Sequence, residues 1–180
     1  MPRSTRVTKI ETAAQYSPHQ APGNTAVRIT QAVGAHDIAH ARALFETYAT
    51  SLAIDLSFQD FAHELATLPG AYRPPDGRLL VAWAGAHAIG VVALRPLTHD
   101  TCEMKRLYVT AEARGTGLGR HLIERAITEA RAIGYAALRL DTLPTMHAAL
   151  RLYRTLGFRE IAPYRDNPIA GALYFEAALL

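Results

Sequence analysis

Hydrophobic side chains recur along the chain with two different periods, and each period predicts one kind of element. Short hydrophobic or alternating runs between turn residues indicate β-strands, whereas hydrophobic residues spaced three and four apart indicate helices. We expect strands at Val27–Ala32, Arg78–Trp83, Ala88–Leu94, Thr101–Val109, Ala136–Leu140, Phe158–Ala162 and Ala172–Leu179. The strands at 78–83 and 88–94 are separated by a tight turn and form a hairpin.

Four helices are expected between these strands. They run from Asp37 to about Leu52, from Ser57 to Leu68, from Gly117 to Ile133 and from Met146 to Leu156. Asp37 and Ser57 are expected to cap the first two helices, because a side-chain oxygen at that place accepts hydrogen bonds from free backbone N–H groups. Gly134 and Gly157 are expected to end the last two.

The order of these elements predicts the fold class. Consecutive strands in the middle of the chain favour antiparallel neighbours, while the helix between Val109 and Ala136 predicts one parallel pair with a right-handed crossover. We therefore expect an α/β (α+β) fold: a mixed, mostly antiparallel twisted sheet flanked by helices on both faces. Residues 25–180 show no internal repeat and are expected to form a single domain.

Composition and charge narrow the class of protein further. The chain has 180 residues, of which 49% are hydrophobic and 19% charged, as in an ordinary globular domain. The formal net charge is +3, and residues 1–24 carry +2 of it through three basic residues and one acidic residue. The domain itself is then nearly neutral, so we expect no nucleic-acid partner. Residues 1–24 are polar and contain several prolines, which predicts a disordered N-terminal extension.

Cysteine use and hydropathy indicate a cytoplasmic protein. Cys102 is the only cysteine, so the chain has no internal disulfide and no thiolate metal cluster. Its apolar surroundings predict an inert buried thiol. The uncharged stretch Leu79–Leu94 is shorter than the roughly 20 residues of a membrane-spanning helix. We expect neither a membrane span nor a secretory signal.

The most informative stretch is the glycine-rich segment 114–119, which follows a predicted strand and opens a predicted helix. The first turn of a helix has unpaired N–H donors and a partial positive charge. Such a place binds anions, above all phosphate groups. Arg114 would add a full charge and bidentate geometry. The segment therefore predicts a phosphorylated ligand.

Three phosphate-binding patterns and one structural alternative compete for this segment. Gly115, Gly117 and Gly119 give G-x-G-x-G, which differs from the dinucleotide fingerprint G-x-G-x-x-G. The Gly-Lys-Ser/Thr of a Walker loop is absent. The third pattern, Arg-x-x-Gly-x-Gly, is met by Arg114, Gly117 and Gly119. A glycine-rich turn without a ligand remains the alternative.

Together with its neighbours, this pattern resembles a known family. Arg114-x-x-Gly117-x-Gly119 is similar to motif A of the GNAT superfamily of acyl-CoA-dependent N-acyltransferases. The strand 103–109 resembles the family's fourth strand, and residues 138–141 resemble its fifth. The segment 149–158, with an alanine, a Leu-Tyr pair and then Gly-Phe, is similar to motif B. The resemblance covers about residues 26–180.

The resemblance implies acetyl-CoA as co-substrate and no metal. Family members hold the CoA pyrophosphate at the start of the motif A helix and pair the pantetheine arm with the fourth strand. The implied cofactor-binding residues are Leu107, Tyr108, Val109, Arg114, Gly115, Thr116, Gly117, Leu118, Gly119 and Arg120. Many members carry an asparagine near the start of the motif B helix. Met146 stands there in this chain, and Thr145 is a candidate replacement.

Two residues are candidates for catalysis. Tyr153 matches the family tyrosine near the CoA sulfur, where a phenol can protonate the leaving thiolate. The alternative is a tyrosine that only anchors the core. Glu103 is the candidate base for the acceptor amine, with Asp141 the weaker candidate, and the alternative for Glu103 is a solvated charge at a strand end. A dedicated base is not obligatory if the amine loses its proton on binding.

Histidines add no metal centre to this interpretation. His36 and His40 stand four residues apart on a predicted helix and could chelate a metal. No third ligand accompanies them, and the sequence therefore favours a solvated helix face.

The sequence thus predicts an N-acetyltransferase that acts on the primary amine of a small molecule by direct attack in a ternary complex. An amino acid is the hypothesised acceptor, because the loop Tyr164–Pro168 and the side chains of Arg73, Arg78 and Arg106 offer cations for a carboxylate. The alternative is a catalytically silent acyl-CoA sensor that regulates a partner protein. Family members often dimerise, which leaves a homodimer open.

Overall fold

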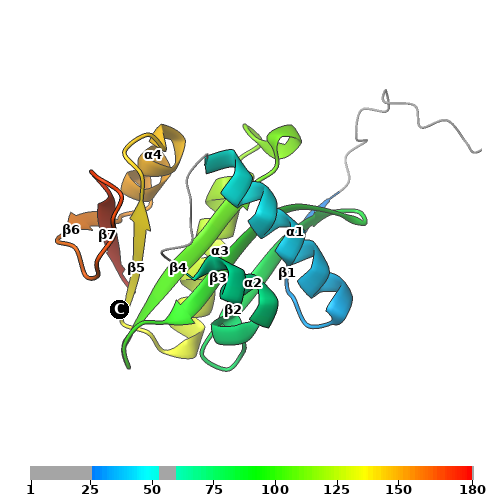
Figure 1. The fold of residues 1–180 in the computed structure, drawn as a ribbon, viewed down its shortest axis with the longest axis horizontal. Helices are drawn as coiled ribbons and strands as arrows, with labels where there is room; N and C mark the ends of the chain where they lie inside the picture. The colour runs from blue at the N-terminus through cyan, green and yellow to red at the C-terminus, as the bar shows by residue number, and fades with distance from the viewer. Residues whose placement is uncertain (1–25, 53–59, 180) are drawn as a thin grey trace, which may run out of the picture.

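The computed structural model describes residues 26–52 and 60–179, which form a seven-stranded sheet with helices on both faces (Figure 1). The strands are β1 (Val27–Gln31), β2 (Arg78–Ala84), β3 (His87–Pro96), β4 (Thr101–Val109), β5 (Ala137–Thr142), β6 (Arg159–Ile161) and β7 (Leu173–Ala178). The helices are α1 (Ala35–Leu52), α2 (Phe61–Thr67), α3 (Leu118–Ile133) and α4 (His147–Thr155), with 3-10 turns η2 (Gly70–Tyr72) and η3 (Ala111–Ala113). The expected N-terminal extension and the expected cap at Ser57 lie outside the described residues.

The strand order across the sheet is β1-β2-β3-β4-β5-β7-β6. Only β4 and β5 are parallel neighbours within the described sheet, and α3 connects them. The other neighbours are antiparallel, and β7 inserts between β5 and β6. This topology confirms the predicted mixed, mostly antiparallel sheet with one parallel crossover.

Side chains along the central strands point alternately to the two faces of the sheet, and each face has its own hydrophobic core. In β2, Leu80 and Ala82 join the core that α3 and α4 cover. Leu79, Val81 and Trp83 join the opposite core, under α1 and α2. Because successive strand side chains point to opposite faces, one fully buried strand supplies both cores. Figure 1 shows α1 and α2 in front of the sheet and α3 behind it.

The start of α1 differs from the prediction. The helix begins at Ala35, so Asp37 lies in its first turn and is not its cap. Gly34 provides the first helical carbonyl, which accepts a hydrogen bond from the Ile38 N–H at 3.1 Å. The Asp37 carboxylate reaches back to the Val33 N–H at 3.4 Å, where its charge favours the helix N-terminus.

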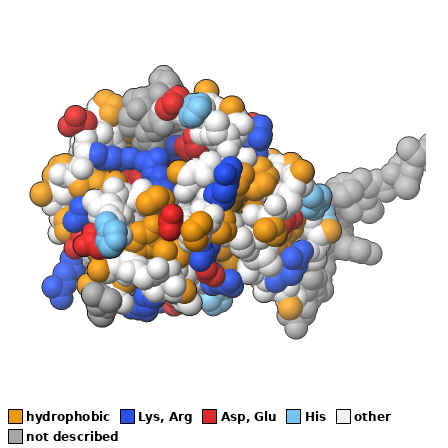
Figure 2. All heavy atoms as spheres, turned by 90° about the horizontal axis from the view of Figure 1, so that it is seen from below, with side chains coloured by type: hydrophobic (Ala, Val, Ile, Leu, Met, Phe, Trp, Pro, Cys, Tyr) orange, Lys and Arg blue, Asp and Glu red, His pale blue; other side chains and the backbone are white. Residues whose placement is uncertain are grey.

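The surface carries a mixture of charged and hydrophobic side chains. Figure 2 shows acidic, basic and hydrophobic side chains interspersed over one face of the molecule, with no broad field of a single sign. Within residues 26–52 and 60–179, no helix combines the length and the apolar character that crossing a bilayer requires.

The core under α3 gives a first prediction. Leu122 is 0% exposed and packs in that core, so Leu122→Ala should lower the free energy of unfolding by about 3 kcal/mol through lost burial and a residual cavity. Urea unfolding measures the change. Val33, which is 84% exposed, is the matched control, and Val33→Ala should stay within about 0.5 kcal/mol of wild type. A Leu122→Ala loss no larger than that of the control would contradict this packing.

Candidate active site

The candidate site lies where β4 and β5 separate. The two strands pair only at Thr101↔Ala137, Cys102↔Leu138 and Glu103↔Arg139, although β4 runs on to Val109 and β5 to Thr142. β5 pairs with β7 along its whole length, from Ala137 to Thr142. β5 therefore stays alongside β7 over its whole length and diverges from β4. The divergence opens a wedge between two central strands.

A β-bulge in β4 reinforces this divergence. Val91 pairs with Tyr108 and Ala93 with Lys105, so the single residue between them on β3 faces two residues on β4. One of the two, Arg106, has φ 57, a left-handed conformation that is strained for a residue with a side chain. Its guanidinium is ion-paired with Glu64 of α2 and lies 4.9 Å from the centre of the Phe61 ring. These contacts hold the bulge, which bends the strand and re-aims the residues that follow.

A groove of about 580 Å³ runs from the bulged part of β4 to α4. Its lining includes Leu107, Tyr108, Val109, Ala113, Arg114, Gly119, Thr145, Met146, Ala149 and Leu152. Five predicted cofactor-binding residues are among them, from the strand and from the glycine-rich turn. Thr145 and Met146 both line the groove, at the place where many family members carry asparagine.

The glycine-rich turn presents backbone to one end of this groove. Gly115 and Gly117 have φ 79 and 87, and a Cβ on either would meet no atom within 4 Å. Gly117 caps α3, and the first helical hydrogen bond comes from the His121 N–H to its carbonyl. The N–H groups of residues 118–120 precede that bond, as the anion-binding prediction requires.

The side chains of the turn have different uses. Leu118 is 3% exposed and packs in the core, so only its backbone can reach a ligand. The Thr116 hydroxyl donates to the Ala113 carbonyl at 2.8 Å. A Cβ on Gly119 would lie 3.4 Å from Leu152, so this glycine lies against α4. Arg120 lies 3.5 Å from Glu124 in a surface ion pair.

A smaller cavity of about 50 Å³ lies inside the wedge. Tyr48 and Leu52 of α1, Leu107 of β4 and Met146 line both this cavity and the groove. The two spaces therefore adjoin at the point where β4 and β5 are apart.

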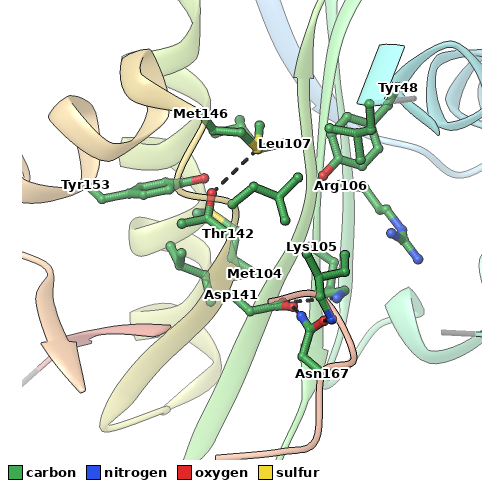
Figure 3. A pocket seen from close by; sticks show the side chains of 14 residues that line it. Tyr48, Met104, Lys105, Arg106, Leu107, Asp141, Thr142, Met146, Tyr153 and Asn167 are labelled. Carbon is green, nitrogen blue, oxygen red and sulfur yellow. Dashed lines mark hydrogen bonds and ion pairs between the residues drawn. The ribbon is translucent and has the colours of Figure 1, made fainter. Parts of the chain in front are cut away.

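Tyr153 of α4 lines this cavity. Its ring is 5% exposed and packs 5.7 Å from Phe158 and 6.0 Å from Phe175, measured between ring centres. Figure 3 shows its hydroxyl directed toward Thr142 and Leu107, in the gap between the strands. Burial raises the pKa of this phenol above its ordinary value, so the group carries its proton at neutral pH.

Glu103 is fully buried, so the alternative of a solvated strand-end charge is wrong. Its carboxylate accepts hydrogen bonds from Arg95 Nε at 2.8 Å and from the Tyr164 hydroxyl at 2.8 Å. Arg165 lies 3.2 Å from it in an ion pair. Glu103 is absent from the described lining of the cavity. Burial raises the pKa of Tyr164, and the charge and the hydrogen bond of Glu103 raise it further.

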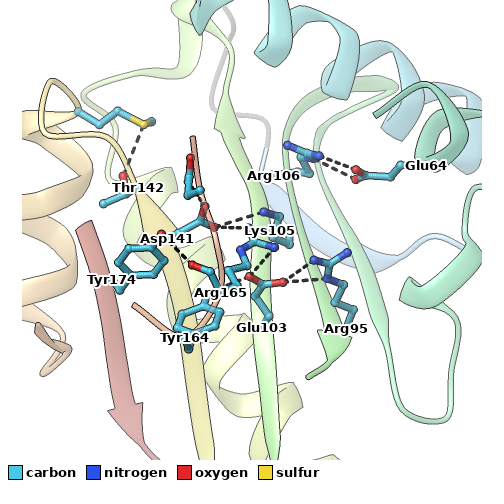
Figure 4. A network of polar contacts seen from close by, with 12 residues as sticks. Glu64, Arg95, Glu103, Lys105, Arg106, Asp141, Thr142, Tyr164, Arg165 and Tyr174 are labelled. Carbon is cyan, nitrogen blue, oxygen red and sulfur yellow. Dashed lines mark hydrogen bonds and ion pairs between the residues drawn. The ribbon is translucent and has the colours of Figure 1, made fainter. Parts of the chain in front are cut away.

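Asp141 lines the cavity and is held by three donors. It accepts hydrogen bonds from Lys105 Nζ at 3.2 Å and Arg165 Nη2 at 2.8 Å (Figure 4) and from Asn167 Nδ2 at 3.0 Å (Figure 3). Burial raises its pKa, but the positive charges of Lys105 and Arg165 outweigh this and lower it. Burial lowers the pKa of Lys105 to about 8, against the opposing charges of Asp141 and Glu103.

The predicted cations separate into two groups. The loop 164–168 does reach the site, through Tyr164, Arg165 and Asn167. Arg78 does not, because it bonds to Glu129 of α3 at 2.7 Å and to carbonyls of its own loop. The guanidinium of Arg106 is taken by Glu64.

Lys105, Thr142 and Tyr48 were not predicted as site residues. A signal for Lys105 was present: Glu103 and Lys105 are charged residues two apart, and so on one face, of a central strand that is otherwise rich in apolar residues. Tyr48 and Thr142 offered none, because each belongs to an ordinary amphipathic pattern. Cys102 is buried as predicted, and burial raises the pKa of its thiol to about 12.

Comparison with known proteins shows which of them this chain resembles. A family model described as the acetyltransferase (GNAT) family matches residues 39–158. An uncharacterised N-acetyltransferase of Schizosaccharomyces pombe is 40% identical over 141 residues, which cover 77% of this chain and 86% of that protein. The N-acetylaspartate synthetase of Danio rerio is 32% identical over 128 residues, covering 69% of this chain and 45% of that protein.

A solved structure of similar fold adds a bound ligand. It is a putative acetyltransferase from Salmonella typhimurium, solved with its cofactor acetyl-CoA. The TM-score is 0.61 at 21% identity, and the match covers 85% of this chain and 94% of that one. At this identity the likeness concerns the fold.

The ion pair that holds the bulge gives a pH-dependent prediction. Glu64 is partly buried, which raises its pKa, but its hydrogen bond and charge interaction with Arg106 lower it below the ordinary value of 4.5. Above pH 4.5 the carboxylate is charged in both states and the pair stabilises the fold fully. Below pH 4.5 the carboxylate of the unfolded state binds a proton while that of the folded state stays charged. The stabilisation therefore decreases as the pH falls and is lost once the pH passes the lowered native pKa.

Glu64→Gln should therefore lower the free energy of unfolding by about 3 kcal/mol at pH 7, and the difference from wild type should shrink below pH 4.5. Chemical unfolding at a series of pH values measures both. Glu112→Gln, at an exposed position of η3, is the control and should follow the wild-type profile. A difference that stays constant down to pH 3 would exclude the pair as its source.

Proposed function

Because this chain belongs to the GNAT family of acetyltransferases and is an N-acetyltransferase, we propose that it transfers an acetyl group from acetyl-CoA to the primary amine of a small molecule. The proposal is carried by the adjoining groove and cavity, which share Tyr48, Leu52, Leu107 and Met146 as lining residues. A long groove suits an extended donor, and a small cavity beside it suits a small acceptor.

The donor would lie along the groove with its pyrophosphate at the glycine-rich turn. Free N–H groups at the start of α3, together with the Arg114 guanidinium, would bind the phosphates. The pantetheine arm would lie along Leu107–Val109 as an added strand, because β5 has left that edge of β4. The acetyl-CoA named for the Salmonella structure supports this choice of donor.

The chemistry would be direct attack within a ternary complex. The amine nitrogen bonds to the carbonyl carbon, the carbon–sulfur bond breaks, and the sulfur takes a proton from the Tyr153 hydroxyl. The proton released by the new amide nitrogen returns to the phenolate through solvent, which restores Tyr153. Holding both reactants in the wedge supplies much of the rate, because a bimolecular reaction becomes effectively unimolecular.

The two predicted carboxylates would have different tasks. Asp141 lines the cavity and is the carboxylate within reach of an acceptor. Glu103 is enclosed by Arg95, Tyr164 and Arg165, which leaves it poorly placed to take a proton from an amine. We therefore assign Glu103 the task of positioning Arg165 and Tyr164, while solvent carries the proton of the new amide nitrogen to the Tyr153 phenolate.

An amino acid is the acceptor class that we favour. The cavity floor contains the ammonium of Lys105, and the Arg165 guanidinium lies beside the same Asp141 carboxylate. These cations would attract a carboxylate group. The name of the Danio rerio relative, N-acetylaspartate synthetase, refers to an N-acetylated amino acid and supports the same class.

Release of the CoA thiol from acetyl-CoA, measured against amino acids, polyamines, aminoglycosides and short peptides, tests this function. Saturable release with amino acids is the expected result. Saturable release with another class alone would overturn the assignment of an amino acid as the acceptor, but it would still support acetyltransferase activity. Absence of release with every class, from a protein that binds acetyl-CoA, would favour the acyl-CoA sensor.

Tyr153→Phe tests the general acid. Removal of the proton donor should lower kcat about a hundredfold while the KM for acetyl-CoA changes little. Steady-state kinetics with saturating acceptor measures both values. Tyr135→Phe is the matched control, because Tyr135 is also buried but donates to the distant Asp76 carbonyl. An unchanged kcat in Tyr153→Phe would leave this tyrosine with a packing function.

Arg114→Gln tests the phosphate end of the groove. Loss of one charge-assisted hydrogen bond should raise the KM for acetyl-CoA about tenfold. The same variant should use S-acetylpantetheine, which lacks the pyrophosphate, as well as wild type does. An equal loss with both donors would show that Arg114 acts on the shape of the groove and does not bind phosphate.

A further inference from the structure

Two histidines of α1 lie together on the far side of the sheet from α3. His36 and His40 are one helical turn apart, and their Nε2 atoms are separated by 3.3 Å. Their ring centres are 4.5 Å apart. Neither residue belongs to the described lining of the groove or the cavity. This pair therefore has no part in the acetyl transfer proposed above.

The separation of the two nitrogens fits a shared metal ion. An imidazole nitrogen binds zinc at about 2.0–2.1 Å. Two such ligands at angles between a right angle and a tetrahedral one are then about 2.8–3.4 Å apart. The observed 3.3 Å lies in this range. Histidines at positions i and i+4 of a helix are a known arrangement for holding a metal on one face.

A neighbouring carboxylate favours the tautomer that binding requires. Asp37 Oδ1 lies 3.4 Å from Nδ1 of His36. A proton on Nδ1 leaves the Nε2 lone pair directed at His40, as in the carboxylate–histidine pairs that orient metal ligands. Without a metal, the His40 Nε2–H donates to that lone pair. On binding, the His40 proton moves to its own Nδ1 through solvent, and both Nε2 lone pairs face the ion.

The single tryptophan of the chain supports both rings. The His36 ring stacks on Trp83 at 5.9 Å between centres and 12° between planes, and the His40 ring meets Trp83 edge-on at 5.1 Å. Trp83 is 2% exposed and its indole N–H donates to Thr30 at 3.1 Å, so it is a fixed platform. The His36 side chain is 74% exposed, which leaves the pair open to solvent ions.

We propose that His36 and His40 form a binding site for a divalent transition-metal ion. Within the described residues, no group of three or more histidine, cysteine, aspartate or glutamate side chains could hold a metal. The ion would thus have two protein ligands, with water filling its other positions and Asp37 acting through His36. Among the divalent ions that imidazole binds, Cu²⁺ should bind most tightly.

Tryptophan fluorescence of the untagged full-length chain tests the site, because Cu²⁺ quenches an indole that it approaches closely and Trp83 is the only one. Titration with CuCl₂ should quench wild type saturably with one equivalent. His36→Ala and His40→Ala should each remove the quenching at the concentration that saturates wild type. Asp37→Asn should weaken binding about tenfold through the lost orientation of His36. His63→Ala, at an exposed position of α2, is the matched control and should bind like wild type.

A second readout does not depend on fluorescence. ZnCl₂ should raise the Tm of wild type and of His63→Ala but not of His40→Ala, because a ligand that binds only the folded state stabilises it. Equal quenching and equal Tm shifts in wild type and His40→Ala would overturn the proposal. Quenching that does not saturate in wild type would overturn it as well.

Discussion

Strand β5 cannot stay paired with both β4 and β7 along its whole length, and the rest of the site depends on this constraint. β5 pairs with β7 along its whole length, from Ala137 to Thr142, but with β4 at three positions only. The wedge that results turns a continuous sheet into one with a gap at its centre. The second half of β4 lines both the groove and the smaller cavity, β5 lines the cavity from the other side, and α4 lines the groove.

A network of buried charges lies where β4 and β5 part, and its members bond to one another. Glu103 and Asp141 lie on facing strands, and Arg165 of the following loop bonds to both. Lys105 and Arg95 complete the set on the β4 side. Removing one member of such a set leaves an uncompensated charge, so the network specifies this geometry more than it adds stability. At the bulge, Glu64 holds a strained Arg106 in the same way.

Local patterns in the sequence were sufficient to predict the helices and strands and the glycine-rich turn at one end of the candidate site. Apolar periodicity predicted the central strands and α3, and the glycines predicted the turn at the start of α3. The start of α1 was misplaced because the helix begins at Ala35, two residues before the aspartate that suits a cap. The burial of Glu103 could not be read from β4, because its partners Tyr164 and Arg165 come from a loop some sixty residues away. The wedge itself depends on where β7 inserts, which is a non-local choice. Tyr153 was predicted only through the resemblance of its helix to a family motif.

The central claim is that the wedge between β4 and β5 brings donor and acceptor together at Tyr153. A crystal structure of the full chain with CoA tests it most directly. The account predicts the pyrophosphate at the glycine-rich turn, the pantetheine arm along Leu107–Val109, and the sulfur within hydrogen-bonding distance of the Tyr153 hydroxyl. CoA bound on another surface, or a sulfur that Met146 separates from Tyr153, would contradict it.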